Sequence, residues 1–160
     1  MKKLLFLLLV FGFNNVYAES GTYSTSAVCD YDKSAINTNN KMVISLYFNC
    51  IATVIKSDND LFPVNQNSYV NLLTSVIKTS NSMDLTGYGT LTSATDSNDK
   101  YFTENNRKVG DIKKGTGGKG KTKIVGGTGK YAGITGECSY TVSYHTEDKM
   151  SSILDCSYTK

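Results

Sequence analysis

The stretch MVISLYFNCIATV, residues 42–54, carries an apolar side chain at every second position. Its even positions are all apolar, namely Met42, Ile44, Leu46, Phe48, Cys50, Ala52 and Val54. Successive side chains of a β-strand point to opposite faces, so a period of two places these residues on one face. The stretch therefore predicts a long strand that is buried on one side.

The segment before this strand alternates on its odd positions, and one face carries Tyr23, Ala27, Cys29 and Tyr31. Between the two segments, the run NTNN at residues 37–40 has the composition of a turn. A hairpin centred between residues 39 and 40 pairs residues whose numbers sum to 79, as those of Cys29 and Cys50 do. We therefore expect these two sulfurs to lie opposite each other on the core-facing side.

The C-terminal part of the chain has the same organisation. One face of its first segment carries Cys138, Tyr140, Val142 and Tyr144, and one face of its second carries Met150, Leu154, Cys156 and Tyr158. A turn centred on Glu147 pairs residues whose numbers sum to 294, as those of Cys138 and Cys156 do. The register favours the local disulfides Cys29–Cys50 and Cys138–Cys156. A closed barrel with adjacent end strands also permits the alternative of Cys29 with Cys156 and Cys50 with Cys138.

Residues 1–18 have the three parts of a secretory signal: a Lys pair, an apolar run at residues 4–13 and a cleavage site ending in Ala18. The apolar run is about half of the roughly 20 residues that a membrane span needs. We expect cleavage after Ala18, no membrane span afterwards, and one domain over residues 19–160. The protein is expected to be secreted or periplasmic and bacterial, in an oxidising compartment where four Cys form disulfides.

The middle of the chain is less regular. Residues 58–67 have the Asn, Asp and Pro content of a loop. Apolar residues at helical spacing over residues 68–78 fit a short helix, and the Val content of the same segment fits an irregular strand. Residues 83–95 and 100–107 predict two strands joined by the turn Asp96-Ser97-Asn98-Asp99, which lacks the Gly and distant Glu of a standard calcium loop.

Residues 115–122, GTGGKGKT, match the phosphate-loop pattern G-x-x-x-x-G-K-S/T. Phosphate binding by this pattern needs a buried strand before the loop and a helix after it. Here a charged segment precedes the match and Gly-rich sequence follows it, so we expect no nucleotide and no other cofactor.

The same region is basic, and an anion patch would contain Lys113, Lys114, Lys119, Lys121 and Lys123. Such a patch suits envelope polysaccharide, phospholipid head groups or nucleic acid. The alternative is a solvated loop loosened by glycine. Without Lys2 and Lys3, 15 basic residues face 14 acidic ones, and the stretch has no aromatic platform for bases, so no nucleic-acid partner is expected.

Residues 126–136, GGTGKYAGITG, are the most informative segment of the chain. The segment resembles the Gly-Gly-Thr-Gly-x-aromatic-x-Gly-x-x-Gly segment of small barrel proteins grouped with plant allene oxide cyclases and dirigent proteins, and of exported bacterial relatives. The resemblance implies an all-β fold, an antiparallel barrel of about eight strands. Its matched positions are turn formers and carry no reaction across. We expect a structural turn at Gly126, Gly127, Gly129, Gly133 and Gly136, with Tyr131 and Ile134 closing one end of the core.

No catalytic template is present. His145, at the tip of the last hairpin, is the single histidine, which excludes triads based on His and sites with several His ligands, and we expect no metal. We expect a non-catalytic barrel that binds a small apolar ligand inside or an envelope partner at its rim. The alternatives are a cyclase- or isomerase-like enzyme with a pocket in the barrel and a structural envelope protein without a ligand. Either a pocket or merely the core would contain Tyr23, Tyr47, Tyr88 and Tyr140.

Overall fold

The structure is a computed structural model that describes residues 18–107, 112–113 and 117–160. The export signal lies almost wholly outside these residues and stays a prediction. The described elements are β1 (Ser20–Asn37), β2 (Met42–Ser57), β3 (Asn67–Lys78), β4 (Met83–Ser93), β5 (Lys100–Arg107), β6 (Ile112–Lys113), β7 (Gly117–Thr128), the 3-10 helix η1 (Gly129–Tyr131), β8 (Thr135–Tyr144) and β9 (Lys149–Thr159). No helix among these residues is long and apolar enough to cross a membrane.

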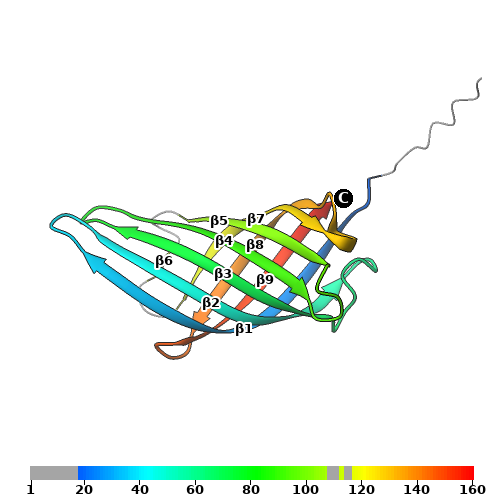
Figure 1. Cartoon of the computed structure of the whole chain (residues 1–160), viewed down its shortest axis with the longest axis horizontal. Coiled ribbons are helices and arrows are strands. Elements are labelled where there is room, and N and C mark those ends of the chain that lie inside the picture. The colour runs from blue at the N-terminus through cyan, green and yellow to red at the C-terminus, as the bar shows by residue number, and fades with distance from the viewer. Residues whose placement is uncertain (1–17, 108–111, 114–116) are drawn as a thin grey trace, which may run out of the picture.

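The long strands form one closed antiparallel barrel. Their order is β5-β4-β3-β2-β1-β9-β8-β7, and a further pairing of β5 with β7 closes the ring. The short strand β6 pairs with β7 beside this ring. The hairpins β1–β2 and β3–β4 extend to the left in Figure 1, whereas η1 and the end of β9 lie on the right. The expected all-β barrel of about eight strands is confirmed.

Both hairpins predicted from the cysteine positions form in the expected register. Cys29 lies opposite Cys50 and Cys138 lies opposite Cys156. Each pair is disulfide-bonded, with the two Cα atoms 4.0 Å apart. This is the local connectivity, so the alternative of Cys29 with Cys156 and Cys50 with Cys138 is wrong. The β1–β2 register holds from the turn back to Thr25, where an irregularity shifts the pairing.

The helix considered for residues 68–78 is wrong, because the segment is strand β3 and pairs with both β2 and β4. The helical spacing arises because both faces of β3 carry apolar side chains. Leu72 and Val76 lie on the inner face, while Tyr69, Leu73 and Ile77 are exposed on the outer face. An apolar set drawn from two faces of a strand imitates one face of a helix. Its β-branched residues fit the strand.

One end of the barrel is closed by an aromatic cluster centred on Phe62, in the loop between β2 and β3. The ring of Phe62 stacks on Tyr23 at 3.8 Å between centroids and on Tyr131 at 5.1 Å. It also meets the edge of Tyr101 at 5.8 Å. Ile134, which has no exposed surface, completes the closure. The expectation that Tyr131 and Ile134 close one end of the core is confirmed.

Three phenols of this cluster make the folded protein less stable at alkaline pH. Burial raises the pKa of Tyr23, Tyr101 and Tyr131 above the usual value. The unfolded chain releases these protons near pH 10, whereas the folded protein keeps them, so the folded state holds more protons above about pH 10. The contribution of these phenols to the free energy of unfolding is therefore fully present below about pH 10, and it is lost as the pH rises towards the folded-state pKa values.

We expect tyrosinate absorbance from these three residues to appear together with loss of the β circular dichroism signal. A titration that records both signals against pH checks this. Complete ionisation of every tyrosine at an unchanged β signal would contradict it. The variant Tyr88→Phe, which changes an exposed side chain, serves as the control and is expected to unfold at the same pH as the parent protein.

Candidate functional site: the barrel interior

The barrel encloses a cavity of about 120 Å³. Small inward residues leave this volume: Ala27 on β1 pairs with Ala52 on β2 and with Ser152 on β9, and all three are buried. Engineered apolar cavities of similar size, about 150 Å³, hold one benzene-sized molecule. The enclosed space therefore has room for a single small ring or a short aliphatic chain.

Most of the lining is apolar. Both disulfides contribute to it, as do Phe48, Val70, Leu72 and Met150. Tyr140 and Leu154, which sequence reasoning placed on inward faces, also line the space. The lumen is thus partly filled by side chains of the chain itself and partly open.

The cavity reaches the end of the barrel that carries the hairpins. There its lining includes Leu46 and Leu85, which are half-buried, and Tyr144, which is 39% exposed. At the opposite end the Phe62 cluster blocks the lumen. A ligand would therefore enter between the hairpins β1–β2, β3–β4 and β8–β9.

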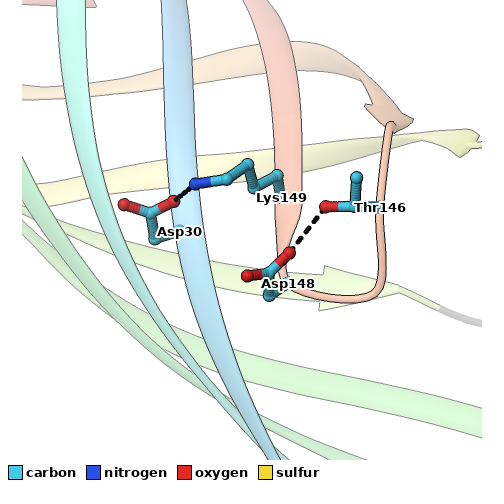
Figure 2. A network of polar contacts seen from close by, with 4 residues as sticks. All are labelled: Asp30, Thr146, Asp148 and Lys149. Atoms are coloured by element: carbon cyan, nitrogen blue, oxygen red, sulfur yellow. Dashed lines mark hydrogen bonds and ion pairs between the residues drawn. The ribbon is translucent and has the colours of Figure 1, made fainter.

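The β8–β9 turn at this mouth is fastened to β1. Lys149 Nζ lies 2.6 Å from Asp30 Oδ1, and the backbone N–H of Tyr31 donates to the carbonyl oxygen of Asp148 at 2.8 Å. Figure 2 shows the contact of Lys149 with Asp30 beside the hydrogen bond of 2.6 Å from the Thr146 hydroxyl to Asp148. The hydrogen bond to Asp30 holds the pKa of Lys149 above its usual value, and the Thr146 hydroxyl lowers the pKa of Asp148. These groups are exposed, so they position the turn without adding much stability.

One wall of the cavity is polar. Thr74 on β3, Thr103 and Asn105 on β5, and Thr122 on β7 line it, with exposed fractions of 3%, 8%, 8% and 3%. The Thr122 hydroxyl donates to the carbonyl oxygen of Glu104 at 3.1 Å. The side chains of Thr74, Thr103 and Asn105 make no hydrogen bond with any residue that the structure describes. Sequence reasoning missed this wall, because on β5 the inward residues Thr103 and Asn105 are polar while the outward Phe102 is apolar.

No charged side chain lines the cavity in the part of the chain that the structure describes. Its acidic groups are phenols, and burial raises the pKa of Tyr101 well above the usual value. His145 lies in the β8–β9 turn, where Nε2 is 2.8 Å from Ser151 Oγ, and it is not part of the lining. Within residues 18–107, 112–113 and 117–160, no three His, Cys, Asp or Glu side chains gather as metal ligands would.

The Gly126–Gly136 segment forms the end of β7, the helix η1 and the start of β8, where it shapes the closed end. Gly129 has a φ of 57°, and a Cβ there would clash with Asp99 and with the Asn98 carbonyl. The Asp99 carboxylate accepts from the Lys130 backbone N–H at 2.8 Å, which ties η1 to the β4–β5 turn. This segment lies away from the open mouth.

The phosphate-loop match falls largely in strand β7. From Gly117 onward the chain is extended and pairs with β5 and β8, so residues 117–122 form neither a loop nor the start of a helix. Thr122, the hydroxyl residue of the match, points into the barrel. Gly115 and Thr116 lie outside the described residues.

Three of the five basic residues lie on one face of β7. Lys119, Lys121 and Lys123 are exposed on the outer face of β7, which corrects the reading of this stretch as a solvated loop. Lys123 pairs across the strands with Glu104 and Glu137, which offset its charge. The side chains of Lys113 and Lys114 lie outside what the structure describes, so an anion patch stays a prediction.

The four tyrosines considered for a pocket or core divide between three places. Tyr23 belongs to the closed-end cluster and Tyr140 lines the cavity. Tyr47 and Tyr88 instead lie on the outer face, 42% and 63% exposed, so assigning them to the interior was wrong. They flank the exposed Leu73 in the register of β2, β3 and β4.

Comparisons with known proteins add little to this picture. No family model and no curated protein matches the chain. Among solved structures, the pterocarpan synthase dirigent protein GePTS1 is similar over 98% of this chain and 96% of its own, with a TM-score of 0.47 and 14% sequence identity. So distant a likeness supports no statement about ligand or activity, and the barrel assignment rests on the strand pairing.

Proposed function

We propose that the protein is an exported, non-catalytic barrel that binds one small apolar molecule in its interior. The observation that carries this proposal is the apolar cavity, closed at one end by the Phe62 cluster and reaching the hairpin mouth at the other. Apolar pockets with a few polar groups are the usual form of small-molecule sites. The two disulfides support an oxidising compartment.

The character of the lining favours binding over catalysis. General acid–base catalysis needs a group whose pKa lies near the working pH, placed at the reacting atom. The described lining offers phenols, hydroxyls and one amide, and none of these suits that role near neutral pH. The cyclase- or isomerase-like alternative would need a reactive group from outside the described residues.

Titration with toluene, followed by amide and methyl chemical shifts, tests the proposal. We expect saturable binding, with the shifts concentrated on cavity residues such as Ala27, Val70 and Leu72. The variant Ala27→Leu places three more carbon atoms in the cavity and is expected to weaken toluene binding at least tenfold.

Val28→Leu is the matched control, since Val28 is the next residue of β1 and lies 67% exposed on the outer face. It should bind toluene as the parent protein does. Absence of saturable binding to the parent protein, or equal binding by Ala27→Leu, would overturn an interior site and leave the rim or the surface as the functional part.

A further inference from the structure

We infer that the cavity selects an uncharged ligand that carries a hydroxyl or carbonyl group, and that Thr74, Thr103 and Asn105 bind this group. The inference rests on the proposed function, because it assigns the polar end of the molecule that the cavity would hold. Buried polar groups in proteins are nearly always hydrogen-bonded. These three side chains are more than nine-tenths buried, line the cavity and have no side-chain partner among the described residues.

The register brings two of these side chains to either side of a glycine. Thr74 on β3 pairs with Gly87 on β4, and Gly87 pairs with Asn105 on β5. A Cβ at Gly87 would lie 2.7 Å from Thr74 Oγ1, so the hydroxyl occupies the space that a side chain on β4 would fill. Glycine at this position therefore lets the Thr74 hydroxyl lie against β4, on the inner surface that the Asn105 amide also lines.

The neighbouring inward position of β4 repeats the arrangement. Gly89 pairs with Thr103 of β5, and a Cβ there would lie 2.6 Å from Thr103 Oγ1. Because β4 has glycine at both positions, the hydroxyls of Thr74 and Thr103 lie against β4, one from each neighbouring strand. With the Asn105 amide, the group presents both donors and acceptors, which suits a hydroxyl or a carbonyl oxygen.

The rest of the lining decides the ligand's charge. A carboxylate or an ammonium group taken from water into this cavity would meet no opposite charge among the described residues. Burial of an unpaired charge is strongly unfavourable, whereas burial of a hydroxyl is tolerated when it is hydrogen-bonded. The cavity therefore fits neutral alcohols, aldehydes and ketones with a small apolar body.

The test compares three probes of similar shape: toluene, benzyl alcohol and benzoate, each titrated into the oxidised protein by NMR. We expect benzyl alcohol to bind at least as tightly as toluene, although water solvates its hydroxyl, and benzoate to bind at least tenfold more weakly than either. The variants Thr103→Val and Asn105→Leu should weaken benzyl alcohol about tenfold, the worth of one or two hydrogen bonds, and leave toluene unchanged or bound more tightly.

Thr103→Val is nearly isosteric, and it removes a buried hydroxyl that has no described partner, so its unfolding free energy should not fall in the absence of ligand. This variant keeps the test decisive if Asn105→Leu folds poorly. Thr86→Val, on the exposed outer face of β4, is the matched control and should change the affinity for neither probe.

The outcomes separate the two proposals. If neither toluene nor benzyl alcohol binds, the interior site itself is overturned. If toluene binds and the ratio of the two affinities is the same in the parent protein and in Thr103→Val, the polar subsite is overturned while the apolar site stands. Benzoate binding as tightly as benzyl alcohol would overturn the selection for uncharged ligands.

Discussion

Replacing Phe62 with alanine is expected to lower the free energy of unfolding by about 3–5 kcal/mol, the cost of deleting a fully buried aromatic ring. The ring is 2% exposed and contacts Tyr23, Tyr101, Tyr131 and Tyr158. Its removal leaves a void between phenols that come from four different elements, and a rigid barrel end cannot collapse around it. Equilibrium unfolding in urea measures the loss.

Phe102→Ala provides a control with the same chemical change. Phe102 is 36% exposed on the outer face of β5, so its truncation should cost roughly 1 kcal/mol, since partly exposed positions lose less transfer free energy and leave no cavity. If the two variants lost equal stability, the loop containing Phe62 would not be the plug of the barrel. Phe62→Leu, which keeps much of the apolar volume, should recover part of the loss.

Removal of either disulfide is expected to cost about 3 kcal/mol, mainly because the unfolded chain regains the freedom of a long loop. The bonds join residues 21 and 18 positions apart, so the two losses should be similar. The change is Cys29→Ala with Cys50→Ala, or Cys138→Ala with Cys156→Ala, and chemical denaturation measures each. The pairs lie on different hairpins, so their effects should add to within a fraction of a kcal/mol.

Reduction provides an independent check. A thiol reductant should destabilise the parent protein by about the sum of the two losses and should leave a variant that lacks all four cysteines unchanged. The double variant Val28→Thr with Ile51→Thr changes the outward cross-strand pair next to Cys29–Cys50 and should cost less than about 1 kcal/mol. A loss of 3 kcal/mol there would assign the effect to the hairpin surface rather than to the cross-link.

The strands that carry cysteine could be predicted from the sequence in pairing and register. In each of them the face that carries the cysteine is clearly more apolar than the opposite face, and a one-residue slip would turn every side chain to the wrong side. Strand β3 lacks this asymmetry because Leu72 faces the cavity while Leu73 faces solvent. Without a polar face, its period could not be distinguished from that of a helix.

The candidate site was harder to predict for a related reason. On β5, the inward residues Thr103 and Asn105 are polar, while the outward residue Phe102 is apolar. Hydrophobic alternation on β5 therefore predicts the opposite orientation, with Phe102 inside and the residues of the polar wall outside. Phe62 lies in a segment whose Asn, Asp and Pro content predicts a loop, and composition does not show that a loop folds inward.

The order in which strands pair has a consequence for how the chain folds. Every long strand from β1 to β9 pairs with the next long strand in sequence, and β1 with β9 is the distant pairing that completes the ring. The hairpins form from nearby residues, whereas the seam between β1 and β9 brings Asp30 to Lys149 from opposite ends of the chain, and its loop-closure entropy is correspondingly larger. We expect the seam to form last. Because one disulfide joins β1 to β2 and the other joins β8 to β9, the oxidised chain reaches this final step with a covalently linked hairpin on each side.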